Sequence, residues 1–483
     1  MKISLFRNIR FQTYLQITNT IIPLITTPHI ARVLGSTQIG VYSVTTSVAA
    51  FFTLFEMLGT TSYGTRAIVA EVDEEKKKDT FAEIYVLQLF SCFIATACYS
   101  IYLFFCQDNK LIAVLQLITL VGYFFDVSWF YFGIEDFKTT VQWSFLFRIL
   151  SFISLFIFVK KTEDLWIYTV IMLSSAALSQ IVLWCLLIKK GYFRFGKIKA
   201  ENVLRHLKPN LLLFVPLIAM TIYHSTDRIM LGMFSTYEQA GYYYNVDKVI
   251  NVPFAVFTGM GTVMLPRMTA MFQEDERNAE DFFYNSLSAF MMLGAAICFG
   301  IIAIAKQFIP LFLGDGYSEC TLLIIIFAPI ILVKCVSNAI RMHYLIPKKL
   351  ESIYIIATMI GAVINAVLNW ILIPKLGASG AEITTIVSEL VALIIQLAFI
   401  FDGKRYLRMA VDLLAYVAMG LLMVFILRAF DNLSSNMLMI TTVKVFAGAM
   451  VYCLMTLVYW IVSGNRFYSL YVRPYLKRKP SDK

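Results

Sequence analysis

The sequence predicts an all-α integral membrane protein with about fourteen transmembrane helices. Hydrophobic residues make up 59% of its 483 residues and charged residues make up 15%, whereas a soluble domain has about 45–50% and about 25%. The mean hydropathy is +0.73. Apolar runs of about 20 residues, the length needed to span a membrane, recur along the chain. No stretch of mixed charge is long enough to form a large soluble catalytic domain.

Fourteen apolar runs have the length of a membrane crossing. The first contains several polar residues and two prolines, which predicts that it faces protein or water instead of lipid. The runs lie at residues 11–31, 39–63, 80–105, 111–133, 140–158, 165–188, 210–231, 240–265, 282–305, 320–340, 352–373, 380–401, 410–427 and 440–463. Aromatic residues concentrate at 124–132, at the end of the fourth run, where they are predicted to form an interfacial belt, with stacking on a sugar as the less favoured alternative.

Alternate loops differ sharply in their content of Lys and Arg, a difference that sets the orientation of membrane helices. The loops on one side, together with both termini, hold 29 of the 41 Lys and Arg residues, and the loops on the other side hold 7. The remaining five lie inside predicted helices. Both termini are therefore predicted to be cytoplasmic.

The longest basic loop, at 189–209, predicts a boundary between two transmembrane lobes. The lobes are expected at 1–188 and 210–402, followed by two additional helices at 403–465 and a basic tail at 466–483. A Q-x-G-x-Y motif follows both the first and the seventh predicted helix, at 38–42 and at 239–243. Tandem lobes are common in transporters, and the motif is either the trace of a duplication or a coincidence.

Composition and motifs argue against several classes of function. The net charge of +10 does not indicate nucleic-acid binding, because Lys and Arg cluster in short gaps between apolar runs. Residues 191–197 match G-x-x-x-x-G-K, but Ile198 stands where a phosphate-binding loop needs Ser or Thr. The four His and eight Cys residues show no metal-ligand spacing. We therefore expect no nucleic-acid partner, no metal and no cofactor.

Charged side chains inside the predicted crossings are the strongest indication of function. Arg148 lies about 15 Å into its crossing, near the centre of a hydrocarbon core about 30 Å thick. Lys334 and Glu389 also fall near helix centres. Such a charge costs about 2.5–3.5 kcal/mol or more, and it usually faces a bundle interior or a wet cavity. Arg148 is predicted to line a substrate cavity, whereas for Lys334 and Glu389 a charge pair that fixes helix packing is an equal alternative.

Two acid–base doublets, Asp227-Arg228 and Asp247-Lys248, lie near the outer ends of the seventh and eighth predicted helices. Neighbours in sequence do not face each other on a helix, so each doublet needs a partner, either the other doublet or the substrate. The complete set of substrate-cavity candidates is Arg148, Arg32, Arg66, Asp227, Arg228, Asp247, Lys248 and Lys334, although Arg32 and Arg66 could equally be loop anchors.

Carboxylates within the crossings make coupling to protons or sodium conceivable. The candidates are Glu56, Asp126 and Glu389. Three further charged residues, Lys444, Glu83 and Asp412, lie near helix ends, where they are predicted to be interfacial.

Five sequence segments occur in the order found in a known family. They are 22–35 with 39–42 (IPLITTPHIARVLG and IGVY), 126–137 (DVSWFYFGIEDF), 227–232 with 241–243 (DRIMLG and GYY), 265–267 (LPR) and 376–382 (LGASGAE). Together they span most of the chain and resemble Wzx-type polysaccharide flippases of the multidrug/oligosaccharidyl-lipid/polysaccharide exporter superfamily.

The resemblance implies two six-helix lobes around a central cavity, with two extra C-terminal helices. It also implies translocation of an undecaprenyl-diphosphate-linked oligosaccharide to the outer leaflet of a bacterial cytoplasmic membrane by alternating access. The product would serve capsule, exopolysaccharide or O-antigen synthesis, with membrane lipids and polysaccharide polymerase and assembly proteins as further partners. Such cargo needs a hydrated path, because each unpaired sugar hydroxyl in hydrocarbon costs several kcal/mol.

Two other functions stay open at the level of sequence. A cation-coupled multidrug exporter of the same superfamily predicts an acidic cavity. A membrane glycosyltransferase or polymerase needs a catalytic carboxylate in a sizeable loop, and the predicted outer loops are short.

Overall fold

The computed structural model describes residues 2–192, 198–400, 403–431, 433 and 436–464. Helices account for nearly all of these residues, and no strand occurs among them. Twelve segments within the described residues are long and apolar enough to cross a membrane. The first, Ile22–Ala70, has 49 residues and contains the second predicted crossing and the end of the first, while α10 covers the seventh. The predicted all-α fold with about fourteen transmembrane helices is therefore confirmed.

The helices follow one another along the chain with short connections. The first half contains α1 (Lys2–Met57), α2 (Thr60–Ala70), α3 (Glu74–Phe105), α4 (Lys110–Leu115), α5 (Leu117–Phe124), α6 (Ser128–Gly133), α7 (Phe137–Phe158), η1 (Thr162–Asp164), α8 (Leu165–Lys189), α9 (Ala200–Arg205) and α10 (Leu207–Phe234). The second half contains α11 (Tyr237–Glu274), α12 (Glu276–Leu313), η2 (Asp315–Tyr317), α13 (Glu319–Phe327), α14 (Pro329–Ile340), η3 (Arg341–Leu345), α15 (Glu351–Leu376), α16 (Ala378–Ala398), α17 (Gly403–Leu427), η4 (Arg428–Phe430) and α18 (Met437–Ser463).

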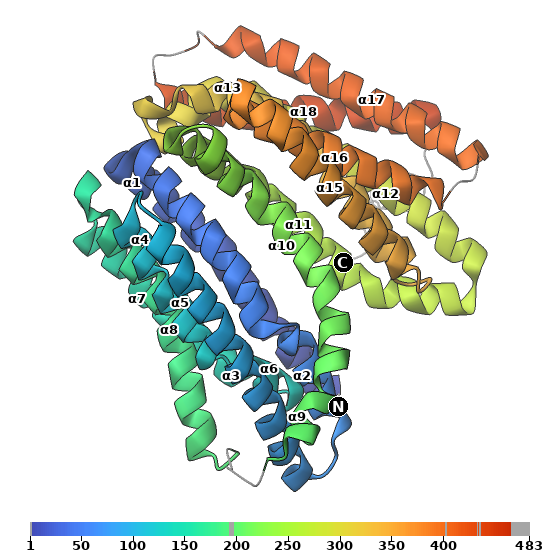
Figure 1. Cartoon of the computed structure of the whole chain (residues 1–483). Helices are drawn as coiled ribbons and strands as arrows, with labels where there is room; N and C mark the ends of the chain where they lie inside the picture. Colours follow the sequence, from blue (N-terminus) through green and yellow to red (C-terminus); the bar gives the residue numbers. More distant parts are fainter. Residues whose placement is uncertain (1, 193–197, 401–402, 432, 434–435, 465–483) are drawn as a thin grey trace, which may run out of the picture. The chain divides into compact units, whose positions relative to one another are not determined.

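The described helices form two compact units, Met1–Tyr244 and Asn245–Lys483. In the first unit, α3, α5, α7 and α10 pack on α1, and α8 packs on α5 and α7 (Figure 1). In the second unit, α12 contacts α14, α17 and α18, while α16 packs on α13, α14 and α15. The boundary between the units falls within α11, because α10 packs on α1 and so belongs to the first unit.

The predicted transport lobes, 1–188 and 210–402 with the pair of helices at 403–465, stay predictions. Most of the loop between the lobes is described, and part of it forms α9. Residues 193–197 of that loop and the predicted tail at 466–483 lie outside the described residues.

The helices are interrupted at three places, one between the first two predicted crossings and two inside crossings that are continuous apolar runs in the sequence. Within α1, Gly35 has φ 76° and ψ 169°, a backbone conformation that favours glycine and that kinks the helix between the first two predicted crossings. The fourth predicted crossing is divided into α4, α5 and α6. The tenth is divided before Pro329, whose ring supplies no backbone donor.

Side-chain caps mark the starts of several helices. The carboxylate of Asp136 accepts a hydrogen bond from the backbone N–H of Thr139 at 3.3 Å. Asp275 accepts from the backbone N–H groups of Arg277 and Asn278 at 3.0 and 3.2 Å. Such caps satisfy donors that the first helical turn leaves unpaired, so α7 and α12 begin at defined residues.

The aromatic residues predicted as an interfacial belt instead form part of the core of the first unit. Trp129 and Phe130 are fully buried, and the indole Nε1 of Trp129 donates to Gln88 Oε1 at 2.9 Å. A Cβ atom at Gly64 would lie 2.4 Å from the Trp129 ring. The glycine therefore lets α2 approach this ring closely. The belt prediction is wrong for Trp129, Phe130 and Tyr131, which α6 buries, whereas Phe124, Phe125 and Phe132 are half-buried.

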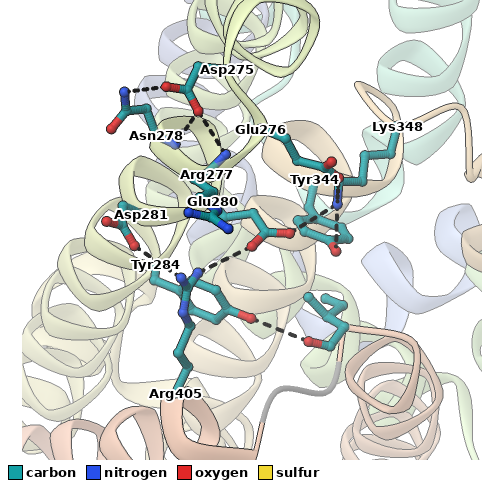
Figure 2. Close-up of polar contacts among 11 residues, drawn as sticks. Asp275, Glu276, Arg277, Asn278, Glu280, Asp281, Tyr284, Tyr344, Lys348 and Arg405 are labelled. Carbon is teal, nitrogen blue, oxygen red and sulfur yellow. Dashed lines mark hydrogen bonds and ion pairs between the residues drawn. The ribbon is translucent and has the colours of Figure 1, made fainter.

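An ionic network joins three segments at one end of the second unit (Figure 2). Lys348, in the turn after η3, pairs with Glu276 at 2.8 Å and with Glu280 at 3.1 Å, both on α12. Arg405 on α17 pairs with Glu280 at 3.4 Å and with Asp281 at 3.2 Å. The basic loops containing Lys348 and Arg405 are predicted on the same side of the membrane, and the network places them at the same end of this unit.

Lys348 lies at the centre of this network and has a perturbed pKa. Burial lowers the pKa of Lys348, but hydrogen bonds from its ammonium group to Glu276, Tyr344 and Glu280 outweigh burial and raise this pKa above its ordinary value. A raised folded-state pKa contributes stability that is complete below the unfolded pKa, about 10.4 for Lys, and is lost as pH rises through the folded pKa.

We predict that Lys348→Met lowers the thermal unfolding temperature of the purified protein, because it leaves two carboxylates without their shared cation. The loss should correspond to about 1–3 kcal/mol. It should stay constant from neutral pH to about pH 10 and shrink only at higher pH. Differential scanning fluorimetry across this range measures it, with the exposed Lys375→Met as the control. An equal loss in the control, or a loss that grows with pH, would contradict the prediction.

Candidate functional site

Arg148 lies in the middle of α7, which has Phe137 and Phe158 at its two ends. Its side chain is half-buried. No residue in the described part of the chain accepts a hydrogen bond from its guanidinium group or pairs with its charge. The alternative of a structural charge pair therefore has no support at Arg148, and the guanidinium keeps its donors available for an anion.

The other two N-terminal arginines lie on helices and not in loops. Arg32 is on α1, three residues before the kink at Gly35, and Arg66 is on α2. Both side chains are exposed. Arg32, Arg66 and Arg148 therefore lie on three different helices.

The first doublet contacts two tyrosines at the start of α11. The hydroxyl of Tyr243 donates to Asp227 Oδ2 at 2.6 Å, and the guanidinium of Arg228 lies 5.0 Å from the centre of the Tyr244 ring. Asp227 is buried, with 3% of its surface exposed. Local partners thus account for part of the doublet's interactions, and its pairing with Asp247-Lys248 stays a prediction.

The two Q-x-G-x-Y motifs contact each other through their glycines. A Cβ atom at Gly40 would lie 1.6 Å from the backbone oxygen of Tyr237, and one at Gly241 would lie 1.9 Å from that of Ser36. Each glycine thus meets the residue four positions before the other. The contact is reciprocal, like that of two copies related by a two-fold axis, and only residues without a side chain permit it.

Two of the coupling candidates share a buried cluster in the first unit. Glu56 on α1 is fully buried. Its Oε1 accepts a hydrogen bond from the Thr96 hydroxyl at 3.0 Å, and its Oε2 has no hydrogen-bond partner among the described residues. Asp126, at the break between α5 and α6, accepts from the backbone N–H of Ser128 at 2.9 Å. Two residues of α3 contact both segments: Ser91 donates to the backbone oxygen of Glu56 at 2.8 Å, and Gln88 donates to that of Asp126 at 2.9 Å. The structure thus places both candidates against α3.

In the second unit, Asp247 accepts a hydrogen bond from Asn251 at 2.8 Å, and the neighbouring Lys248 is half-buried. The ammonium group of Lys334, on α14, lies 5.8 Å from the centre of the Phe254 ring. Among the described residues, Lys334 and Glu389 of α16 form no ion pair. The alternative that either residue belongs to a charge pair that fixes helix packing therefore receives no support.

The described residues contain no group of three His, Cys, Asp or Glu side chains suited to hold a metal ion.

The sequence profile of the family described as polysaccharide biosynthesis protein matches residues 5–272, more than half of the chain. The chain belongs to this polysaccharide biosynthesis protein family. The kinship predicted from the five sequence segments is thereby confirmed at the level of the family.

Relatives and solved structures agree with the family assignment. The chain is 21% identical over 411 residues, 83% of its length and 98% of the relative's, to an Escherichia coli (strain K12) protein whose name assigns it to O-antigen transport. It is 23% identical to Agl15 of Haloferax volcanii, named as a low-salt glycan biosynthesis flippase, over 51% of this chain and 53% of Agl15. The fold matches that of the lipid II flippase MurJ in an inward closed conformation, with a TM-score of 0.71 and 18% identity over 94% of this chain and 99% of MurJ.

One carboxylate of this family member escaped the sequence analysis. Glu382, near the start of α16, is fully buried, and neither of its oxygens has a hydrogen-bond partner among the described residues. It interacts electrostatically with Asp247. Glu389 is a candidate because it is an acidic residue within the apolar run at 380–401. Glu382 lies in the same run and meets the same criterion.

Three charged residues predicted as interfacial are instead buried and paired. Lys444 is 2% exposed, and its ammonium group pairs with Asp431 and donates to Gln307 Oε1 at 3.2 Å. Glu83 is 5% exposed and accepts from Arg205 at 2.7 Å. Buried charges persist where partners satisfy them, so these are structural groups.

Asp412 is the third of these residues and is 7% exposed. Its carboxylate accepts hydrogen bonds from the hydroxyls of Ser288 at 2.9 Å and Tyr459 at 2.6 Å. Two hydroxyl donors satisfy a buried carboxylate as an ion pair would. This explains how Asp412 is buried without a positively charged partner.

Proposed function

We propose that this protein is a flippase that translocates an undecaprenyl-diphosphate-linked oligosaccharide from the cytoplasmic to the outer leaflet of a bacterial cytoplasmic membrane. The product would serve capsule, exopolysaccharide or O-antigen synthesis. The observation that carries the proposal is Arg148, a half-buried cation in the middle of a membrane span with no partner among the described residues. Family membership and the names of the relatives support the choice of cargo.

A diphosphate suits such a cation for two reasons. Arginine binds phosphate oxygens through parallel, charge-assisted hydrogen bonds. A membrane potential that is negative inside favours outward movement of an anion by about 2.3 kcal/mol per charge per 100 mV. With both termini cytoplasmic, as the distribution of Lys and Arg predicts, the potential drives the cargo in the required direction without ATP.

Alternating access needs a contact that can close and reopen, and the glycine contact has suitable properties. Gly40 and Gly241 lie near the helix ends predicted to face outward, and they join helices from the two predicted lobes. Because backbone meets backbone there, the helices can separate without extracting interlocked side chains. We assign this contact to closure of the outer side.

Ion coupling would add to the effect of the potential. Glu56, Asp126 and Glu389 are the carboxylates predicted for this role, and Glu382 joins them. An ionised carboxylate in hydrocarbon is costly without a partner. Glu56 and Glu382 each have at least one buried oxygen with no hydrogen-bond partner among the described residues, a state that a proton or a bound cation would relieve.

The function is tested by deleting the gene and locating undecaprenyl-linked oligosaccharide in the two leaflets. We expect it to accumulate in the cytoplasmic leaflet, and the parent protein to restore its transfer. Unchanged transfer would contradict the proposal. Accumulation of cationic drugs without a change in the lipid-linked oligosaccharide would favour a multidrug exporter, and sugar transfer by the purified protein would favour a glycosyltransferase.

In a reconstituted translocation assay, we predict that Arg148→Ala reduces the rate by about 10²-fold, since a hydrogen bond to a charged group contributes about 1.5–3 kcal/mol. Arg148→Lys should keep the charge, lose the bidentate geometry and fall between Ala and the parent. Arg428→Ala is the matched control for loss of one positive charge, because Arg428 is exposed and is not a cavity candidate. Equal rates for the parent and both Arg148 variants, at equal amounts in the membrane, would remove Arg148 from the mechanism.

A further inference from the structure

A polar pocket lies between the first turns of α12 and the first turns of α17, within the second unit. Its cavity volume is about 330 Å³. Each helix contributes four residues at spacing i, i+3, i+4 and i+7, which places them on one face of that helix. They are Asp281, Tyr284, Asn285 and Ser288 from α12, and Arg405, Arg408, Met409 and Asp412 from α17.

The two carboxylates of this pocket already have partners. Asp412 accepts from Ser288 and Tyr459 as described above, and the Ser288 hydroxyl also lies 2.9 Å from the hydroxyl of Tyr416. Asp281 pairs with Arg405 at 3.2 Å, and Figure 2 shows the Arg405 side chain extending from α17 toward the two carboxylates of α12. The pocket therefore does not offer an open cation site.

Two donors of the pocket remain available. Neither Arg408 nor Asn285 makes a side-chain hydrogen bond or ion pair within the part of the chain that the structure describes. A guanidinium group carries five N–H donors and an amide carries two. The ligand that would use these donors is therefore an anion with hydrogen-bond acceptors. A phosphate group is such an anion, and its geometry matches that of a guanidinium group.

The surroundings of the pocket indicate where the phosphate comes from. Leu407, Val411 and Leu414 of α17 are 70%, 51% and 68% exposed, and they lie beside the pocket residues on the same helix. Such exposed apolar side chains on a membrane helix face acyl chains. A lipid could place its phosphate against the donors of Arg408 and Asn285 and its acyl chains against the exposed apolar residues of α17. A free anion would contact only the donors.

We propose that this pocket binds the phosphate of an anionic phospholipid, held by Arg408 and Asn285. The pocket holds two arginines beside two aspartates that already have partners. Arginine and lysine side chains between transmembrane helices hold anionic headgroups on the cytoplasmic side, the side on which the sequence predicts the starts of α12 and α17. The bound lipid would link α17, one of the two additional C-terminal helices, to α12. The proposal does not depend on the transport activity.

Native mass spectrometry of the full-length protein in detergent tests the proposal, with dioctanoyl phosphatidylglycerol as the probe. We expect one saturable site for this lipid, and a dissociation constant raised about tenfold by Arg408→Gln, which removes the charge-assisted bonds. Arg428→Gln is the matched control, because Arg428 is exposed in η4, after the other end of α17, and carries the same charge. It should leave binding unchanged.

A second variant keeps the proposal testable if Arg408→Gln does not fold. Asn285→Asp keeps the side-chain shape and adds a negative charge, so it should also weaken phosphatidylglycerol binding. The proposal is overturned if Arg408→Gln and Asn285→Asp both bind like the parent, or if Arg428→Gln weakens binding equally. It is also overturned if dioctanoyl phosphatidylcholine binds as tightly, or if inorganic phosphate displaces the lipid at equal concentration.

Discussion

The cost of placing a charge among hydrocarbon chains governs which side chains of this protein are structural and which are functional. A buried charge persists only if partners, water or a ligand compensate it. Lys444, Glu83 and Asp412 are buried and find their partners within the protein. Arg148 is half-buried, and no described residue compensates it. We propose that the compensating group is water or an anion, as a passage for a phosphorylated lipid would provide.

The same constraint separates the two kinds of polar cluster in the second unit. The network of Lys348 and Arg405 with the carboxylates of α12 satisfies its own charges and ties three segments together (Figure 2). A few residues further along the same helices, Arg408 and Asn285 keep donors that no described residue uses. The ionic network and the proposed binding residues thus lie close together on α12 and α17. They differ in whether their donors have acceptors among the described residues.

Sequence reasoning found the helices because their signal is local. Apolar runs of spanning length predict the all-α fold, and the Q-x-G-x-Y repeat marks two segments that contact each other through Gly40 and Gly241. The break at Gly35 falls in the predicted gap between the first two runs, whereas the break at Asp126 escaped sequence reasoning, because a broken helix is as apolar as a continuous one. The partners of charged residues escaped it as well. His206 approaches Glu83 across 123 residues of sequence, and no local pattern specifies such a contact.

The central claim, that Arg148 borders a wet passage, is tested most directly by replacing it with cysteine and measuring labelling in native membranes. The protein without this substitution gives the background from its own eight cysteines. We expect that a charged, membrane-impermeant thiol reagent modifies position 148 and that a lipid-linked oligosaccharide slows the reaction. Labelling by a lipid-soluble maleimide alone, with no reaction toward the charged reagent, would show that this position faces hydrocarbon or dry protein and would contradict the account.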